Sequence, residues 1–375
     1  MRIGLDVAQT CLERHGRGWI ADRVATAISN ICRADDVILY HQFGDWLNWD
    51  TSRGTVIGQS NVSAPFLGSF WFGARIAWKR IEAGRSNLPG DPEVVHSFSL
   101  QGPNIGNARL VYTVYDLSFW THPEFASESN RLICQRGMLN AIRAASGFAF
   151  ISENTRNDFS TLFPLPKRVQ MLPTVVLHLA SRFPSVPISR SELLPGPWLS
   201  IGAMEPRKNF ELFLDAFEIY RERSNCGRKL CLAGGRGWKS EATWRRIADL
   251  QQRGIVEHRG YVSDRELQGL YRASFGFVFP NHYGSFGLPV LESMSQACPV
   301  IASKNSSSTG VGGEAVLYWD GKSAESLAES MLQLEHDEQL YVRLSKAGLD
   351  RSRLFSWEKT ALDLREFYNR VVFSG

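Results

Sequence analysis

The sequence predicts an α/β protein of two units, each built on a parallel sheet. The chain has 375 residues, more than one ordinary core, since domains usually contain about 100–200 residues. Short apolar stretches alternate with longer amphipathic ones, which is the order of strands and helices in a parallel sheet. A proline-rich stretch over 182–198 separates an early series of these stretches from a later one.

The first series starts at the N-terminus, where the apolar stretch RIGLDVA predicts a strand. A helix is predicted over 19–31. Further strands are predicted at DVILYHQF, PEVVHSF, RLVYTVYDL and SGFAFIS.

The second series starts at PWLSIGA and continues with a predicted helix over 209–222. Apolar residues recur in that helix at i, i+3, i+4 and i+7, so one face is expected in the core. These core residues are Phe210, Phe213, Leu214 and Phe217. Ser263 and Glu266 form a capping box that predicts the start of another helix. Strands are predicted at KLCLAGG, IVEHRGYV, FGFVFP and CPVIAS.

The domain boundary is predicted from four prolines that no helix or central strand would tolerate. They are Pro184, Pro187, Pro195 and Pro197. We therefore expect a first domain over 1–182, a linker over 183–197 and a second domain over 198–355. The C-terminal stretch 356–375 has a helical pattern with a serine at its start.

Composition excludes several classes of protein. Hydrophobic residues make up 43% and charged residues 21%, which is typical of a folded globular chain and not of a disordered one. A net charge of +4 is mild for this length and gives little support for a nucleic-acid binder. The six cysteines form no Cys-x-x-Cys pair, which argues against a zinc site or a disulfide framework. Without a signal-like or membrane-spanning apolar run, we expect a cytoplasmic protein with at most peripheral contact to the inner face of a membrane.

The stretch GAMEPRKNFELF places charged residues between a predicted strand and the start of a predicted helix. Glu205, Arg207 and Lys208 would lie at the carboxyl edge of the sheet. The free N–H groups of a helix N-terminus favour anions there, and two cations add to that preference. An anion site is one interpretation, and a solvated basic turn is the other.

The stretch SFGLPVLES has the same design. Gly287 would allow close approach of the backbone, and Pro289 suits the first turn of a helix. Glu292 lies about one turn into that helix, where a Glu is either a ligand contact or a surface residue favoured by the helix dipole.

Two glycine-rich stretches follow predicted strands. AGGRGW and ERHGRGW, the latter with Gly16 and Gly18, could let a nucleotide approach the backbone. Each could equally be a tight turn.

Together these motifs resemble those of the family-four retaining glycosyltransferases, which have the GT-B fold. The second half carries the resemblance in GAMEPRKNFELFLDAF, GYVSDRELQGLY, FVFPNHYGSFGLPVLESM and PVIAS. In the first half VVHSFSL, RLVYTVYDLSFWTHPEF and FISENTRNDF resemble the acceptor domain of the mannosyltransferase-like branch. The resemblance covers nearly the whole chain. It implies two Rossmann-like domains with parallel sheets facing a central cleft, and a C-terminal helix that crosses back to the first domain.

The resemblance implies transfer of a hexose, foremost mannose from GDP-mannose, to a saccharide or lipid-linked saccharide in polysaccharide biosynthesis. The donor would be GDP- or UDP-linked, the anomeric configuration would be retained, and no metal ion or other cofactor is expected. Glu292 matches a Glu that binds ribose hydroxyls, and Lys208 with Arg207 matches cations that hold the diphosphate. Donor contacts are implied for Gly16, Gly18, Glu205, Arg207, Lys208, Val262, Ser285, Phe286, Gly287, Leu288 and Glu292. Catalytic roles are implied for Tyr115, Asp116, Arg207 and Lys208.

Three positions depart from the family pattern. Gly284 stands where the family has the first Glu of a pair, Tyr115 replaces a His, and Thr309-Gly310 replaces a Pro-Glu. In this family the departing phosphate oxygen helps to deprotonate the acceptor, so the lost Glu and His would act by positioning and electrostatics. We therefore expect an active transferase with altered donor recognition, such as one for a deoxy sugar. The alternatives are a catalytically impaired subunit and a sugar-nucleotide epimerase.

The stretch 64–85 mixes aromatic residues with cations. Aromatic rings beside cations suit a membrane interface and an anionic lipid diphosphate. A partly buried helix with a basic outer face is the alternative. The aromatic and apolar residues are Phe66, Leu67, Phe70, Trp71, Phe72 and Trp78, and the cations are Arg75, Lys79, Arg80 and Arg85.

Overall fold

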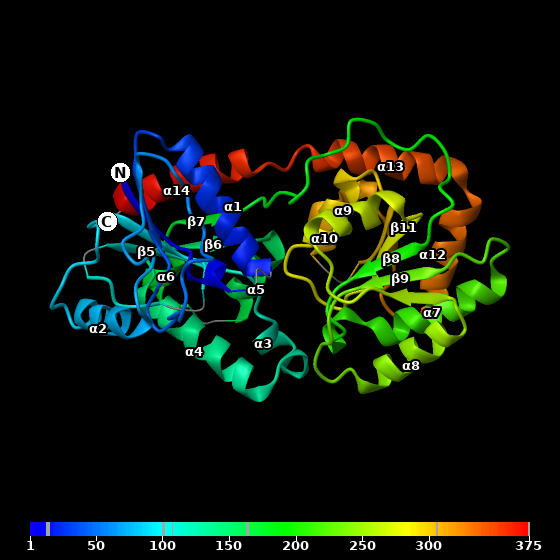
Figure 1. Ribbon diagram of the computed structural model, residues 1–375, viewed down its shortest axis with the longest axis horizontal. Helices are drawn as coiled ribbons and strands as arrows, with labels where there is room; N and C mark the ends of the chain where they lie inside the picture. The colour runs from blue at the N-terminus through cyan, green and yellow to red at the C-terminus, as the bar shows by residue number, and fades with distance from the viewer. Residues whose placement is uncertain (13–15, 100–101, 107, 163–164, 305–306, 374–375) are drawn as a thin grey trace. The chain divides into compact units, whose positions relative to one another are not determined.

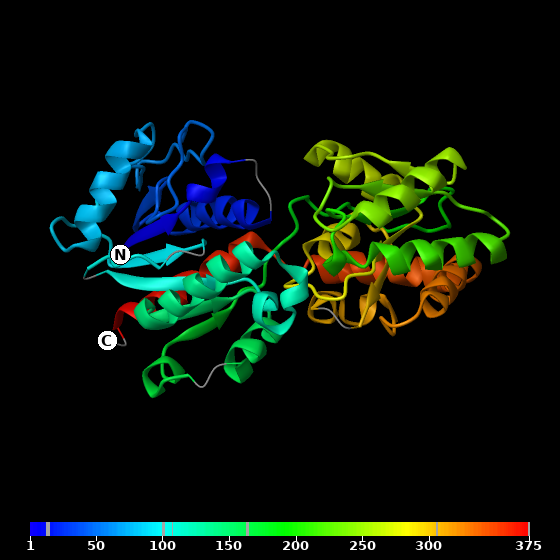
Figure 2. The same ribbon diagram turned by 90° about the horizontal axis from the view of Figure 1, so that it is seen from below.

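The computed structural model describes residues 1–12, 16–99, 102–106, 108–162, 165–304 and 307–373 (Figure 1). The chain divides into two compact units, Met1–Leu179 with Ser356–Gly375, and Ala180–Phe355. Each unit contains one sheet with helices on both faces (Figures 1 and 2). The predicted α/β architecture with two parallel sheets is confirmed.

The sheet of the first unit has seven strands in the order β3-β2-β1-β4-β5-β6-β7, and every pairing is parallel. The strand order reverses between β1 and β4. The strands are β1 (Arg2–Asp6), β2 (Asp36–Tyr40), β3 (Val62–Ser63), β4 (Val94–Ser97), β5 (Arg109–Val114), β6 (Gly147–Phe150) and β7 (Thr174–Val176). The helices are η1 (Ala8–Cys11), α1 (Gly16–Ile31), α2 (Trp71–Glu82), α3 (Ser118–Thr121), η2 (Pro123–Phe125), α4 (Glu128–Ala144), α5 (Glu153–Leu162), α6 (Lys167–Gln170) and α14 (Trp357–Phe373).

The C-terminal helix α14 belongs to the first unit, where it packs beside α1. Its inner face is apolar, and Tyr368 adds a hydrogen bond of 2.6 Å between its hydroxyl and Nδ1 of the buried His96. Arg365 on the same helix donates to Asp35 at 2.9 Å, and Asp35 also accepts from the N-terminal amino group at 2.8 Å. Buried polar partners far apart in the sequence therefore hold both chain ends on the first sheet.

The sheet of the second unit has six parallel strands in the order β10-β9-β8-β11-β12-β13. Its order reverses between β8 and β11. The strands are β8 (Trp198–Ile201), β9 (Leu230–Ala233), β10 (Val256–His258), β11 (Gly276–Phe279), β12 (Val300–Ser303) and β13 (Leu317–Trp319). The helices are η3 (Pro206–Lys208), α7 (Phe210–Arg223), α8 (Glu241–Gln252), α9 (Asp264–Ala273), α10 (Leu288–Ser295), α11 (Ser308–Gly312), η4 (Gly313–Ala315), α12 (Ala324–His336) and α13 (Glu338–Ser352).

The predicted core face of α7 is confirmed, because its four apolar residues are all buried. The start of α9 is also as predicted, since the Ser263 hydroxyl accepts from the Glu266 N–H at 3.3 Å. Three short edge strands, β3, β7 and β13, were not predicted. Each has only two or three residues, too few to show an alternating pattern.

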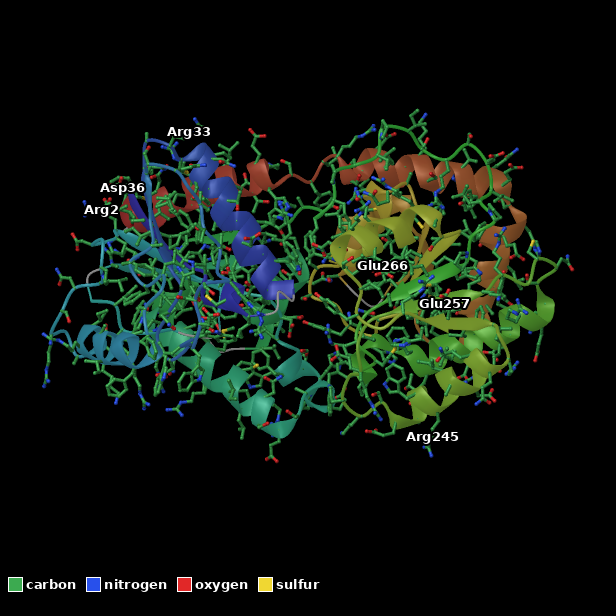
Figure 3. The ribbon with its side chains drawn as sticks, viewed as in Figure 1. Arg2, Arg33, Asp36, Arg245, Glu257 and Glu266 are labelled. Carbon is green, nitrogen blue, oxygen red and sulfur yellow. The ribbon has the colours of Figure 1, made fainter. Side chains whose placement is uncertain are left out.

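Charged residues of both signs lie on the surface of each unit, in keeping with the mild net charge. Exposed examples are Arg2, Arg33 and Asp36 in the first unit and Arg245, Glu257 and Glu266 in the second (Figure 3).

The segment expected to be a linker, 183–197, is instead part of the second unit. Val186 N donates to Ser295 O at 2.9 Å. The Arg190 guanidinium donates to four backbone carbonyls of residues 271–275, at the end of α9, at 2.6–3.2 Å. The prolines correctly indicated irregular backbone. They could not reveal that a cation of this segment satisfies the open carbonyls of a helix 81 to 85 residues away.

The glycine-rich AGGRGW leaves the end of β9 as a loop whose backbone packs against the backbone of neighbouring loops. Gly202 N donates to Ala233 O at 2.9 Å, and Gly234 N donates to Gly260 O at 2.7 Å. Gly234 has φ +140°, and a Cβ there would lie 2.1 Å from the Gly202 carbonyl oxygen. The loops after β8, β9 and β10 can meet only because this position has no side chain.

We predict that Gly234→Ala lowers the free energy of unfolding by at least about 1–3 kcal/mol, because backbone atoms must move to admit the methyl group. Gly235→Ala is the matched control, since a Cβ at Gly235 meets nothing within 4 Å. Urea unfolding of both variants measures the difference. Equal stability of the two variants would contradict the prediction.

Candidate functional site

The residues singled out in the second unit gather where the strand order of its sheet reverses. The loop after β8 and the loop after β11 come from neighbouring strands and bond to each other. His282 N donates to Arg207 O at 3.0 Å, and Asn209 Nδ2 donates to Pro280 O at 3.3 Å. Ligands of open α/β sheets bind at the carboxyl ends of strands at such a reversal point.

Lys208 is half-buried beside Arg207, which lies in an ion pair of its own. Arg207 donates to Glu205 at 2.7 Å, and the Lys208 ammonium lies 5.5 Å from the centre of the Phe279 ring. No ion pair of Lys208 is recorded within the described part of the chain. Burial, with a smaller contribution from the Arg207 charge, lowers the pKa of Lys208 to about 7. An anion bound here would interact with an ammonium group that has already lost part of its hydration.

The N-terminus of α10 lies on the neighbouring loop. Gly287 caps it with φ +103°, and Pro289 lies in the first turn. Phe286 is buried against Phe355, which anchors the loop, while Ser285 and Leu288 are half-buried. Pro289 has no N–H, and the N–H groups of Val290 and Leu291 donate to Gly287 O at 2.9 and 3.2 Å. At most the N–H groups of Gly287 and Leu288 are left at this helix end, where the helix dipole favours an anion.

Gly284, where the family carboxylate is missing, is held by its backbone. Its carbonyl accepts from both the N–H and the hydroxyl of Ser307. Ser307 precedes α11, in which Thr309 and Gly310 replace the family's Pro-Glu. The loop therefore has a defined anchor without a side chain at 284.

Glu292, for which the resemblance implies a ribose contact, is held by an arginine and a tyrosine in this structure. Arg182 donates to both of its carboxylate oxygens, at 2.5 and 2.9 Å, and the Tyr271 hydroxyl donates at 3.2 Å. Only 1% of the Glu292 side chain is exposed. A third nitrogen of Arg182 donates to Asp264 at 3.0 Å. The ribose contact stays a prediction.

Arg182, which stands 110 residues before Glu292, was not among the predicted site residues. It lies in the proline-rich stretch, where no periodic pattern marks a buried residue. Val262, another implied donor contact, comes two residues before Asp264 in the chain and is half-buried.

The remaining predicted residues lie together in the first unit. Gly16 is exposed and Gly18 is buried in the first turn of α1, and the Arg17 guanidinium between them lies 6.0 Å from the Tyr115 ring centre. Asp116 accepts from the N–H and hydroxyl of Ser118 at 3.1 and 2.6 Å, so one carboxylate oxygen caps the start of α3. The Asp116 carboxylate therefore holds the backbone at the start of α3.

The comparisons with known proteins agree with this geometry. The model of the family described as "Glycosyl transferases group 1" matches residues 197–351, which include the whole β8–β11 site. O-antigen chain mannosyltransferase B of Escherichia coli is 31% identical over 260 residues, covering 67% of this chain and 67% of that protein. The chain belongs to the group 1 glycosyl transferases.

A second relative of this glycosyltransferase is mannosylfructose-phosphate synthase of Agrobacterium fabrum, 29% identical over 175 residues. That match covers 44% of this chain but only 38% of the relative. Among solved structures, sucrose-phosphate synthase of Thermosynechococcus elongatus matches with a TM-score of 0.71 at 19% identity, covering 100% of both chains. At that identity the likeness shows the fold alone, and the predicted GT-B fold is confirmed.

We predict that Arg182→Gln in this glycosyltransferase lowers the free energy of unfolding by about 3–5 kcal/mol, because it leaves the Glu292 carboxylate buried without its partner. The double variant Arg182→Gln/Glu292→Gln should lose less. Arg156→Gln is the control, since Arg156 and Glu153 form an exposed pair that should contribute about 0–1 kcal/mol. Urea unfolding compares the variants, and a loss for Arg182→Gln no larger than the control's would refute the prediction.

Proposed function

We propose that this glycosyltransferase moves a mannosyl group from GDP-mannose to a saccharide acceptor in cell-envelope or exopolysaccharide assembly, with retention of the anomeric configuration. The observation that carries the proposal is the convergence of Lys208, Arg207 and the α10 N-terminus at the reversal point of the second sheet. Both relatives described above have names that denote mannosyl chemistry, which supports mannose over other hexoses.

In this proposal the diphosphate lies between the cations and the N-terminus of α10. Glu205 holds the Arg207 guanidinium at 2.7 Å, so its orientation is set before a ligand arrives. Lys208 would neutralise the charge that develops on the leaving phosphate. These two cations would take the place of a metal ion.

The proposed reaction breaks the bond between the anomeric carbon and the diphosphate oxygen. A new bond forms from that carbon to the acceptor hydroxyl oxygen, and the hydroxyl proton passes to the departing phosphate oxygen. The chain therefore need not supply a nucleophile, which is compatible with Gly284 in place of a carboxylate.

A nucleotide with a different sugar is the second candidate donor. Gly284 offers no side chain to a sugar hydroxyl, and its carbonyl already accepts two hydrogen bonds from Ser307. A deoxy sugar would lack a hydroxyl for the missing carboxylate to bind.

A thermal-shift panel with GDP-mannose, UDP-glucose and dTDP-rhamnose tests the donor. A ligand at about 100 times its dissociation constant stabilises the folded protein by roughly 2.7 kcal/mol. We expect GDP-mannose to give the largest shift and Lys208→Gln to remove most of it. A Glu292 variant is unsuitable because it also breaks the ion pair with Arg182. If no nucleotide sugar shifts the melting temperature, the non-catalytic interpretation takes the place of this proposal.

The pH dependence of donor binding follows from the lowered pKa of Lys208, about 7 in the free protein. A diphosphate favours the charged ammonium and so raises this pKa on binding. The affinity for GDP-mannose should therefore fall as the pH rises from 7 to 9, by up to about tenfold per pH unit. The diphosphate of a nucleotide sugar is fully esterified and does not titrate in this range.

Isothermal titration calorimetry at pH 6, 7, 8 and 9 measures this dependence. In the control Lys208→Arg the guanidinium stays charged throughout, so its affinity should be nearly constant. A flat profile for the wild-type protein would show that Lys208 does not contact the diphosphate.

We further propose that the acceptor is lipid-linked and that one surface of the first unit meets an anionic membrane. We define the aromatic surface as Trp49, Leu67, Phe70, Trp71, Phe72 and Ile76. Trp49 and Phe70 are each 77% exposed. Trp71 joins its neighbours, with ring centres 4.8 Å from Trp49 and 5.8 Å from Phe72.

The aromatic surface is separate from the inner face of α2. Ala74, Trp78 and Ile81 are buried there, and Trp78 with Phe66 belongs to the core. The exposed cations Arg75, Lys79 and Arg80 share the helix with the exposed aromatic residues. Apolar side chains flanked by cations suit the interface of an anionic bilayer. Of the helices in the described ranges, none has the length and apolar character needed to cross a bilayer.

We predict that Trp49→Ala/Phe72→Ala weakens binding to vesicles of mixed anionic and zwitterionic lipid by roughly tenfold or more, because two aromatic side chains no longer bury apolar area. Vesicle flotation measures the bound fraction. The control Met171→Ala/Leu354→Ala removes two equally exposed apolar side chains that lie outside this surface. Failure of the wild-type protein to float with anionic vesicles would rule out the membrane contact.

A further inference from the structure

The short helix α11 is held in place by side chains from two other elements of the second unit. Helix α13 packs beside α10, and its next-to-last residue is Arg351 (Figure 1). The Arg351 guanidinium donates to Gly310 O at 2.8 Å and to Val311 O. The Tyr318 hydroxyl on β13 donates to Ser308 O at 3.3 Å. These donors satisfy carbonyls that the end of a helix leaves open.

Helix α11 in turn holds the loop that leads into α10. Ser307, directly before α11, donates its N–H at 3.3 Å and its hydroxyl to Gly284 O. The two segments are also close further along, because a Cβ at Gly287 would lie 3.5 Å from Ser308 Cα. A polar connection therefore runs from Arg351 through α11 to Gly284.

An apolar connection reaches the same loop. The Arg351 guanidinium lies 6.0 Å from the centre of the Phe355 ring. Phe355 packs edge-on against Phe286, with ring centres 6.3 Å apart and planes at 83°. Only 5% of Phe286 is exposed. Arg351 therefore supports the loop at two points, Gly284 through hydrogen bonds and Phe286 through ring packing.

The composition of α11 makes this outside support necessary. The helix has five residues, and Gly310 and Gly312 are two of them, so its own backbone gives it little stability. Gly310 belongs to the Thr309-Gly310 pair that replaces the family's Pro-Glu. Gly313, with φ +52°, makes room for the guanidinium, since a Cβ there would lie 2.6 Å from Arg351 Cζ.

We infer that Arg351 is a positioning residue for the nucleotide-sugar donor. It fixes the loop 284–288 and with it the N-terminus of α10, where the diphosphate is proposed to lie. Hydrogen bonds weaken steeply when their geometry is distorted, so a loosened loop binds the diphosphate less tightly. The identity of the ligand rests on the proposed function, whereas the anchoring of the loop does not.

Backbone hydrogen exchange of the ligand-free full chain is the first test. In Arg351→Gln, segment 284–292 should exchange at least about tenfold faster, because the loop loses support at both points. Arg168→Gln is the matched control, since Arg168 also donates to three backbone carbonyls at a helix end, that of α4, at 2.7–3.2 Å. The control should exchange faster only near the end of α4.

Isothermal titration calorimetry with GDP-mannose is the second test. Arg351→Gln should raise the dissociation constant about tenfold, the order expected for one lost hydrogen bond, whereas Arg168→Gln should leave it unchanged. A merely structural role would lower the stability of both variants and leave both dissociation constants at the wild-type value. If Arg351→Gln does not fold, Tyr318→Phe takes its place, with a rise of roughly threefold from the loss of the weaker bond to Ser308 O.

The outcomes separate this inference from the proposed function. Faster exchange in segment 284–292 together with weaker GDP-mannose binding supports the positioning role. If the wild type binds no nucleotide sugar but the exchange still rises, the proposed function fails and the anchoring of the loop by Arg351 stands. Unchanged exchange and an unchanged dissociation constant in both Arg351→Gln and Tyr318→Phe would overturn the inference, even where the wild type binds the donor.

Discussion

Parallel pairing of the strands is the constraint on which the rest of this structure depends. Every pairing in both sheets is parallel, so each crossover returns to the same edge and the carboxyl ends of the strands meet there. The reversal of strand order sends the two loops beside it to opposite faces and leaves polar backbone open between them. Lys208 and the α10 N-terminus occupy that place in the second unit, and Asp6 at the end of β1 occupies it in the first.

The buried charged groups fall into two classes, those whose charge is matched by partners and those whose charge is not. Asp35 accepts from the N-terminal amino group and from Arg365, and Glu335 accepts from Ser224 at 2.6 Å and lies 3.4 Å from Arg228. Glu292 with Arg182 belongs to the same class. Lys208 and Asp6 differ. Burial lowers the pKa of Lys208 to about 7 and raises the pKa of Asp6 to about 6, because nearby charges and hydrogen bonds do not fully compensate for the lost hydration. Such incompletely offset groups are typical of sites that hold a ligand.

Without a carboxylate at position 284, the proposed transfer depends more on the other residues of the site. A displacement in which the leaving phosphate takes the acceptor proton depends mainly on the charge held around the diphosphate. The anchoring of the Gly284 carbonyl by Ser307 keeps the loop and the start of α10 in place without that side chain. In the proposed reaction the donor sugar would therefore lose a contact, whereas the proposed diphosphate contacts Lys208 and Arg207 are both present.

The sequence by itself determined the order of strands and helices, the parallel sheets, the buried face of α7 and the loops that carry Lys208 and Gly287. Those features depend on local periodicity, capping and turn chemistry, which lie within a few residues of one another. It could not show that Arg182 binds Glu292, that Arg190 completes the end of α9, or that Asp6 lies beside Ser97 on the neighbouring strand. These contacts join residues tens to more than a hundred positions apart and depend on strand register and burial. Only the tertiary structure sets which charges lose water and which find a partner, because that depends on which distant residues fold against each other.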